Sequence, residues 1–156
     1  MKILVLSDSH GSVSNMERAV EIVRPDAIYH LGDCWRDAEK LRRLFPGIPM
    51  EQVPGNCDYQ PLEAAEKLLF PGEKRVFLCH GHTRRVKSSL LEAGFLAEEQ
   101  KLDVFLFGHT HRPLCDWRGG TMFLNPGSIG NYVHPTYAVL TIGDGNVNSR
   151  IYDLDA

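Results

Sequence analysis

The chain has 156 residues, a formal net charge of −3, 43% hydrophobic residues and 24% charged residues. This composition is ordinary for a globular protein, and a chain of this length can bury a core of its own, so we expect a single domain over residues 1–156. The basic pairs Arg42–Arg43 and Arg84–Arg85 are short, and no run of more than two basic residues occurs. This argues against binding to duplex nucleic acid and leaves a small nucleotide open.

The apolar segments and the cysteines indicate the compartment. No apolar segment reaches the length of a membrane helix, and the first apolar run, residues 3–6, is too short for the core of a signal peptide. We therefore expect a cytoplasmic protein with no membrane partner. The cysteines form no Cys-x-x-Cys pair, and disulfides are rare in a reducing compartment. Cys34 and Cys115 are predicted to be small buried side chains, whereas Cys57 and Cys79 adjoin polar motifs.

The first half of the chain alternates apolar strands with amphipathic helices. Its first helix is predicted to begin at a capping box, Ser14–Glu17, and to end before Pro25. His30 lies inside a predicted strand and is expected to be a core histidine with its hydrogen bonds satisfied. The predicted strands cover residues 2–6, 27–31 and 50–53, and the second helix covers residues 36–45 and ends at Pro46–Gly47.

The second half is predicted to be mostly antiparallel. Turn residues at 70–73, 119–120 and 143–146 each separate two apolar stretches, which is typical of β-hairpins. An amphipathic helix is expected from residue 86 to about residue 100 despite Gly94. The predicted hairpins span residues 66–79, 113–124 and 137–154, and a buried strand covers residues 103–107.

Polar side chains follow the first three predicted strands. Asp8 and His10 come after the strand at 2–6, Asp33 follows a glycine after the second strand, and Asn56 follows Pro54–Gly55. Carboxylate, imidazole and amide groups are all ligands of divalent cations. Asp, Asn, Ser and the Pro-Gly-Asn sequence are also common turn residues, so each motif taken alone has turn formation as an alternative explanation.

Two His-x-His motifs follow two further predicted strands. His80 and His82 come after Arg75–Cys79, and His109 and His111 come after Asp103–Phe107 and Gly108. Alternate side chains of an extended segment point the same way, so both histidines of a pair could serve one site. Surface loops carry His-x-His by chance, but two such pairs in one small domain favour a metal site.

All these donors follow strands, and ligands of α/β sheets gather at the carboxyl ends of the strands, so we expect the donors to meet in one crevice. Seven mixed oxygen and nitrogen donors exceed what one tetrahedral zinc takes and suit two divalent cations that share a bridging carboxylate. This donor mixture tolerates manganese, iron, zinc or cobalt, and the residues do not choose among them. As cofactors we expect two divalent cations, and we name manganese first, with nickel, iron, zinc, cobalt or magnesium as alternatives. The candidate ligands are Asp8, His10, Asp33, Asn56, His80, His109 and His111.

The order of these motifs resembles a known family. Asp-x-His, Gly-Asp, Gly-Asn-x-Asp, His-Gly-His and Gly-His-Thr-His occur in sequence over residues 8–111, as in the calcineurin-like metallophosphoesterase superfamily and its small bacterial and archaeal phosphodiesterase branch. The segment Asn125–Ser128 is a further match. The resemblance implies an α/β fold, a four-layer sandwich of two mixed β-sheets flanked by helices.

The resemblance also implies roles for the donors. Asp33 would bridge the two metals, and the catalytic group would comprise Asp33, Asn56 and His82. For His82 we expect contact with the phosphate or support of a ligand, with a purely structural role as the alternative. The first metal site would be completed by Asp8, His10 and His111, and the second by Asn56, His80 and His109.

The implied activity is hydrolysis of a small phosphodiester or nucleotide-like substrate. A hydroxide held between the two cations would attack phosphorus in line, so no protein nucleophile is needed. Cys57 stands where many members of the superfamily have a histidine that is thought to protonate the leaving group. We therefore expect a preference for good leaving groups, and we interpret Cys57 first as a small buried side chain and second as a proton donor.

Other interpretations remain for parts of the chain. The same fold also serves as a non-catalytic protein-binding scaffold, as in the small subunit of the retromer coat, but there the metal ligands are degraded. Metallo-β-lactamase-like hydrolases need His-x-His-x-Asp-His, which neither histidine pair supplies. Arg84 and Arg85 are expected to be solvated. Trp117 and Tyr132 are expected in the core, with the surface of a homo-oligomer as the alternative.

Overall fold

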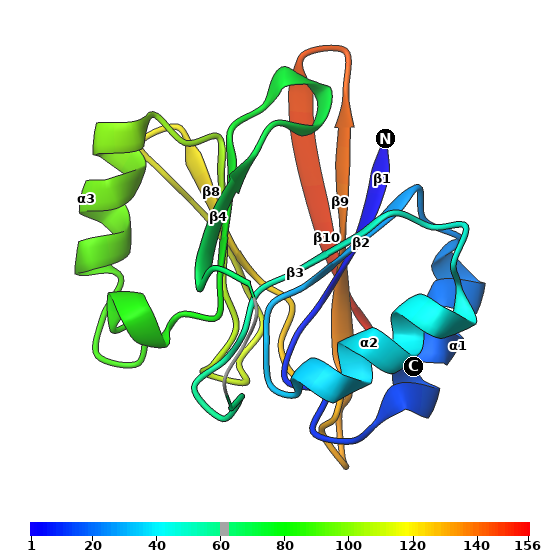
Figure 1. Cartoon of the computed structure of the whole chain (residues 1–156). Helices are drawn as coiled ribbons and strands as arrows, with labels where there is room; N and C mark the ends of the chain where they lie inside the picture. The colour runs from blue at the N-terminus through cyan, green and yellow to red at the C-terminus, as the bar shows by residue number, and fades with distance from the viewer. Residues whose placement is uncertain (60–62) are drawn as a thin grey trace.

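Two five-stranded sheets form the centre of the molecule in a computed structural model that describes residues 1–59 and 63–156. The strand order is β10-β9-β1-β2-β3 in the first sheet and β4-β5-β6-β8-β7 in the second. Figure 1 shows α3 on the outer side of the second sheet, and α1 and α2 on the opposite side of the molecule, beside the first sheet. The order of layers is therefore helix, sheet, sheet, helix, which confirms the predicted sandwich.

The first sheet combines a parallel and an antiparallel half. β1 pairs in parallel with β2, and β2 with β3, whereas β9 runs antiparallel to β1 and to β10. Its β1 strand is buried at four of its five positions because both sheet faces are covered. The strands are β1 (Lys2–Leu6), β2 (Ala27–His30), β3 (Met50–Gln52), β9 (Thr136–Gly143) and β10 (Asn146–Asp153).

The second sheet is built in the same way. β5, β6 and β8 are parallel to one another, and the antiparallel strands β4 and β7 form its two edges. The hairpins predicted over residues 66–79 and 113–124 are therefore present. The strands are β4 (Glu66–Leu69), β5 (Val76–Cys79), β6 (Val104–Leu106), β7 (Leu114–Arg118) and β8 (Thr121–Asn125).

Three hydrophobic layers hold the sandwich together. Between the sheets, residues such as Val5 of β1 and Leu106 of β6 are fully buried in one cluster. Met16 of α1 and Leu41 of α2 pack on the first sheet, and Ala97 of α3 packs beside phenylalanines on the second. The helices are α1 (Val13–Val23), α2 (Trp35–Leu44) and α3 (Leu91–Gln100), with short 3-10 turns η1 (Pro71–Glu73) and η2 (His82–Arg84).

Two local predictions about the helices are wrong. α1 begins at Val13 with Ser12 as its N-cap and has no side-chain cap hydrogen bond, so Ser14 lies inside the helix and forms no capping box. α3 begins at Leu91 rather than at residue 86, and it buries Ala93 and Ala97. Leu96 of α3 also packs against this layer, whereas Leu91 and Phe95 are exposed.

The predicted burial of several side chains is also wrong. Cys57 and Cys115 are exposed, and Cys34 is only half-buried. Trp117 lies on β7, an edge strand, and is 55% exposed, and Tyr132 is fully exposed in a loop. Residue type alone did not reveal the exposure of Trp117 and Tyr132, because an edge strand or a loop has a face that other elements leave uncovered. Within residues 1–59 and 63–156, every helix is too short or too polar to cross a membrane.

Candidate metal centre

The loops after the parallel strands of both sheets meet at one place. Gly108 follows β6, and a Cβ atom at this glycine would overlap Ser7 Oγ and lie 2.7 Å from Asp8 Oδ2 after β1. The backbone N–H of His109 donates a 3.0 Å hydrogen bond to the same Asp8 oxygen. Because Gly108 has no side chain, the carboxyl ends of the two sheets approach closely enough to share donors.

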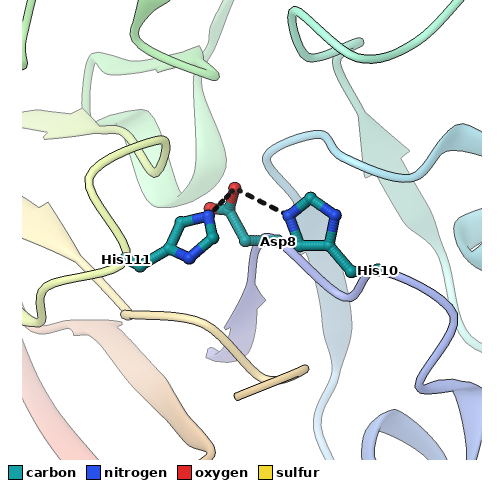
Figure 2. A group of neighbouring side chains, drawn as sticks. All are labelled: Asp8, His10 and His111. Atoms are coloured by element: carbon teal, nitrogen blue, oxygen red, sulfur yellow. Dashed lines mark ion pairs between the residues drawn. The ribbon is translucent and has the colours of Figure 1, made fainter.

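Asp8 lies at the centre of the site and is fully buried. Its Oδ1 atom faces three imidazole Nε2 atoms, at 3.7 Å from His10, 3.7 Å from His80 and 3.1 Å from His111. Figure 2 shows the rings of His10 and His111 converging on this carboxylate from two sides. Within the described part of the chain, Asp8 Oδ1 has no hydrogen-bond partner.

Asp33 lies between two of these histidines. Its Oδ2 atom is 3.4 Å from His80 Nε2 and 4.0 Å from His10 Nε2, and its Oδ1 accepts a 3.0 Å hydrogen bond from the backbone N–H of Cys57. Burial alone raises the pKa of Asp33, but the hydrogen bonds from His80 and Cys57 outweigh it and hold the pKa well below its usual range. Asp33 is therefore a carboxylate, ready to bind a cation.

His80 and His109 come from neighbouring parallel strands. His80 is fully buried, and its Nδ1–H donates to the carbonyl oxygen of Leu31 at 2.8 Å, which turns Nε2 toward the carboxylates. His109 Nδ1 lies 3.2 Å from His80 Nε2. Burial, with the charges of His80 and Lys87, lowers the pKa of His109 to about 4. A neutral imidazole of this kind is a metal ligand rather than a cation.

The side chains form two groups with the spacing of metal ligands. In each group, one potential ligand atom per residue lies within 4.8 Å of the others. Asp8 belongs to both groups. Asp33 Oδ2 lies near His80 of one group and His10 of the other. Two carboxylates, Asp8 and Asp33, therefore lie between the two groups, whereas the family resemblance implied Asp33 alone as the bridge. The groups are Asp8, His10 and His111, and Asp8, Asp33 and His80.

Asn56 and His82 lie at the periphery of these groups. Asn56 is exposed, and its amide nitrogen lies 3.7 Å from Cys57 Sγ. The ring of His82 is centred 5.7 Å from that of His80, and its Nδ1 is buried without a hydrogen-bond partner among residues 1–59 and 63–156. Burial and the neighbouring His80 lower the pKa of His82. The predicted roles of Asn56 and His82 stay predictions.

Two aspartates that the sequence analysis did not single out hold the ligand loops. Asp58 accepts backbone N–H groups of Asp33 at 3.1 Å, Trp35 at 2.6 Å and Gly55 at 2.7 Å, and so joins the loops after β2 and β3. Asp37 accepts the Ser9 hydroxyl at 2.8 Å and the Gly11 N–H at 2.6 Å. Asp58 is the final aspartate of the Gly-Asn-x-Asp motif, so the motif could have indicated that it has a role at the site.

His30 and Arg84 have structural partners. His30 is buried, with Nδ1 accepting from the Gly32 N–H at 3.2 Å and Nε2 lying 3.1 Å from Ser9 Oγ, as expected of a satisfied core histidine. Arg84 is not simply solvated, because it donates two hydrogen bonds, at 2.6 and 2.8 Å, to Glu66. Arg85 is exposed, as expected.

The backbone of the site is strained. Non-glycine residues rarely adopt positive φ, and the cost is of order 1–3 kcal/mol each unless the surrounding structure imposes it. Strain of this kind clusters at functional sites. Among the candidate ligands, positive φ angles of 42–69° occur at Asp8, His10, Asp33, His109 and His111.

Residues 1–145 match the model of the calcineurin-like phosphoesterase superfamily domain. The chain belongs to the calcineurin-like phosphoesterase superfamily. It is 33% identical over 159 residues to the probable metallophosphoesterase YsnB of Bacillus subtilis, covering 98% of this chain and 91% of YsnB. It is 29% identical to the phosphodiesterase YfcE of Escherichia coli, covering 83% of this chain and 79% of YfcE.

The fold of this phosphoesterase family member also occurs in Vps29. The structure of Vps29 from Entamoeba histolytica complexed with Zn²⁺ has a TM-score of 0.75 and 20% identity, and the match covers 99% of each chain. At this identity the likeness concerns the fold alone. The arrangement of two stacked sheets flanked by helices is therefore shared across a wider group than the bacterial relatives.

Proposed function

We propose that this chain is a phosphodiesterase that works with two divalent cations bound between the two sheets. The class of reaction, hydrolysis of a phosphoric ester, follows from its membership of the phosphoesterase family. The observation that carries the proposal is the Oδ1 atom of Asp8, a buried carboxylate oxygen faced by three imidazole nitrogens at 3.1–3.7 Å and without a hydrogen-bond partner among the described residues. A buried charge of this kind is stable only beside a counter-charge.

The donor chemistry fits divalent cations. The carboxylates of Asp8 and Asp33 and the imidazoles around them are hard and borderline ligands, suited to manganese, iron, zinc or cobalt. We propose manganese as the first cation to load. When bound, the cations would activate water and offset the negative charge on the phosphoryl oxygens. Following the family resemblance, we assign one cation to Asp8, His10, His111 and Asp33, and the other to Asp33, Asn56, His80 and His109. The observed ligand groups support Asp8, His10 and His111 for the first and Asp33 and His80 for the second, with Asp8 close to both.

The chain's own residues orient the site for this chemistry. Asp33 is kept ionised by its hydrogen bonds, and the Leu31 carbonyl holds the His80 ring with Nε2 toward the carboxylates. Burial alone lowers the pKa of His80, but the hydrogen bond to Asp33 and the nearby carboxylate charges outweigh it and raise that pKa, so His80 would release a proton when a cation binds at Nε2. We assign to His82 a contact with the substrate phosphate, since its buried Nδ1 lacks a partner among the described residues. Asn56 would complete the second cation's ligands from an exposed loop.

For the substrate we propose a small phosphodiester or a nucleotide-like molecule. YfcE, a relative covered over 79% of its length, is named a phosphodiesterase, which supports a diester over a monoester. The net charge of −3 gives no basic surface for a long nucleic acid. We also propose that the protein acts in the cytoplasm. Self-association stays a prediction, which the exposed Trp117 and Tyr132 make worth testing.

The test uses protein stripped with a chelator and reloaded with one cation at a time. Bis(4-nitrophenyl) phosphate and 4-nitrophenyl phosphate report diester and monoester hydrolysis, and calorimetry with Mn²⁺ gives the number of bound ions. We expect two ions per chain, and faster hydrolysis of the diester. Tight binding of two ions without hydrolysis of either ester would instead support a non-catalytic scaffold, and the absence of ion binding would refute the proposal.

A further inference from the structure

A groove of about 560 Å³ lies beside the candidate metal centre. It runs between the segment that precedes α3 and the segment that leads from β6 into β7. Its walls are mostly apolar, and three polar side chains lie along it. The groove is lined by Val86, Leu90, Phe107, Pro113 and Leu114, together with Lys87, Thr110 and Arg112.

The groove adjoins the site, although no candidate ligand is among the described residues that line it. Thr110, which lines it, separates the candidate ligands His109 and His111 in the sequence. On the opposite wall, a Cβ atom at Gly81 would lie 2.5 Å from Val86 Cγ2 and 3.5 Å from His109 Cβ. A molecule whose phosphate lies at the metal centre would therefore have the groove next to it.

Two cationic side chains line this groove. Within residues 1–59 and 63–156, neither Lys87 nor Arg112 forms an ion pair, whereas nearby Arg84 is engaged by Glu66. The charge of Lys87 is close enough to His109 to contribute to the lowering of its pKa. An anionic group at the centre would thus be attracted by uncompensated positive charge from the groove side.

A second groove on the other side of the site has the opposite character. It lies beside His10, has a volume of about 380 Å³, and is lined largely by polar residues that include Ser12, Asn15 and the acidic Asp155. Tyr132 and Pro135 also line it, but among the described residues its lining contains no lysine or arginine. The groove at Lys87 and Arg112 combines a mostly apolar wall with two cationic side chains, so of the two it is the better match for an anionic molecule with an apolar substituent.

We propose that the groove lined by Leu90, Lys87 and Arg112 binds one ester arm of the substrate, and that this arm is an aromatic or other apolar group attached to the phosphate. The inference rests on the proposed function, because it places the phosphate at the candidate metal centre. Leu90 and Leu114 contact the arm, while Lys87 and Arg112 attract the anionic phosphate. The preferred substrates are accordingly diesters with at least one aromatic arm.

Phosphonates test the groove without any ester bond to cleave. We compare phenylphosphonate with methylphosphonate, measuring their dissociation constants by calorimetry on manganese-loaded protein and their inhibition of bis(4-nitrophenyl) phosphate hydrolysis. Partial burial of a phenyl ring predicts about tenfold tighter binding of phenylphosphonate by the wild type. Equal affinities would overturn the inference.

Variants of the groove test whether the preference for phenylphosphonate arises there. Leu90→Trp should fill the groove and abolish the difference between the two phosphonates, and Leu114→Trp repeats this from the facing wall should the first variant fail to fold. Leu91→Trp is the matched control, because Leu91 is 64% exposed and lies outside this groove. Loss of the preference in Leu91→Trp as well, or its survival in both groove variants, would contradict the assignment.

Charge variants test the second half of the inference. Lys87→Met and Arg112→Met should each weaken both phosphonates by about twofold to fivefold, an effect that shrinks at high salt because exposed charges are screened. Lys40→Met, at an exposed position of α2, is the control and should change nothing. Equal effects of Lys40→Met and Lys87→Met would refute a role for the groove's cations.

The outcomes separate the groove from the proposed function. If loaded wild-type protein hydrolyses diesters but binds both phosphonates equally, the groove inference alone fails. If it hydrolyses nothing yet binds phenylphosphonate more tightly, and Leu90→Trp removes that preference, the groove is supported as a site for aromatic phosphoryl compounds while the proposed function fails.

Discussion

The two aspartates and the two exposed histidines of the candidate metal centre are held in different ways. Asp8 and Asp33 are only 0% and 3% exposed, and backbone N–H groups hydrogen-bond to both carboxylates. By contrast, the side chains of His10 and His111 are 40% and 46% exposed. The fold therefore fixes the carboxylates before any cation binds, while these two histidines lie on loops at the surface.

Because of this difference, substitutions of the two kinds of ligand should affect cation affinity and the stability of the fold differently. A loop imidazole can be lost with little effect on packing, because it contributes little buried surface. A buried carboxylate is tied into the backbone of both sheets, so its removal affects the geometry of the whole centre. The predictions below test this contrast, from the largest expected effect to the smallest.

Asp33→Asn should reduce diester hydrolysis most, by roughly a thousandfold, because it weakens both cation sites at once. Asp8→Asn should have a similar effect, since Asp8 belongs to both ligand groups. Steady-state kinetics at saturating Mn²⁺ measure the loss, and circular dichroism checks that the fold is kept. His111→Ala is the comparison on the imidazole side, and we expect added Mn²⁺ to restore part of its activity. Turnover of Asp33→Asn at the wild-type rate would refute the two-metal assignment.

His30 should make the stability of the chelator-treated protein depend on pH. Burial lowers the pKa of His30 to about 4, against 6.5 for the exposed group, so the folded state keeps it neutral while the unfolded chain takes up a proton. Its contribution to stability is complete above pH 6.5 and is lost as the pH falls toward 4, by about 2 kcal/mol at pH 5.

Urea unfolding at pH 7.5 and pH 5 measures this loss. Groups other than His30 also titrate in this interval, so the comparison is between the wild type and His30→Gln. The variant should be less stable at pH 7.5, and its free energy of unfolding should fall less between the two pH values. A fall of the same size in both proteins would show that His30 is not responsible.

Asp58→Asn should lower the affinity for Mn²⁺ by about 10- to 100-fold, because Asp58 positions the loops that carry Asp33 and Asn56 without facing the cations itself. We expect the free energy of unfolding to fall by about 1–2 kcal/mol as well, since three N–H groups lose a charged acceptor. Calorimetry and urea titration measure the two effects. Asp116→Asn, at a half-exposed position of β7 where Asp116 pairs with Arg118, is the control: it should leave the affinity for Mn²⁺ unchanged and lower the free energy of unfolding by less than Asp58→Asn does.

Cys57→His should help substrates with poor leaving groups by about tenfold and those with good leaving groups less, because general-acid assistance matters most when the leaving group is basic. The exposed thiol has a raised pKa, caused first by its hydrogen bond to Asp33 and then by burial, and so carries a proton at neutral pH. Cys57→Ala shows whether that proton is used. A series of aryl diesters graded by leaving-group pKa provides the measurement, and a uniform effect across the series would count against this role.

The smallest effect is expected at Arg84. Because its guanidinium is held by Glu66, Arg84→Met should leave KM unchanged and lower the free energy of unfolding by no more than about 1 kcal/mol. Thermal unfolding and diester kinetics distinguish a structural ion pair with Glu66 from a contact with the substrate. A raised KM with unchanged stability would mean that Arg84 contacts the substrate after all.

The sequence by itself determined the order of the elements and the position of the candidate donors at the ends of strands. An apolar run followed by glycine and a polar group is a local pattern, and it placed Asp8, Asp33, His80 and His109 at the ends of strands that the structure contains. The hairpins follow in the same way from turn residues between apolar stretches. The strand-end pattern and the turn residues both depend only on neighbouring residues, so they can be recognised without knowledge of the fold.

Only the tertiary structure decided how these segments meet. The shared position of Asp8, the three N–H groups gathered by Asp58 and the groove at Lys87 join residues from different strands and loops. Burial was decided there too, since Cys57 and Trp117 are exposed although their residue types favour the interior. Burial and long-range contacts depend on what lies across the sheet or the loop, which no local pattern specifies.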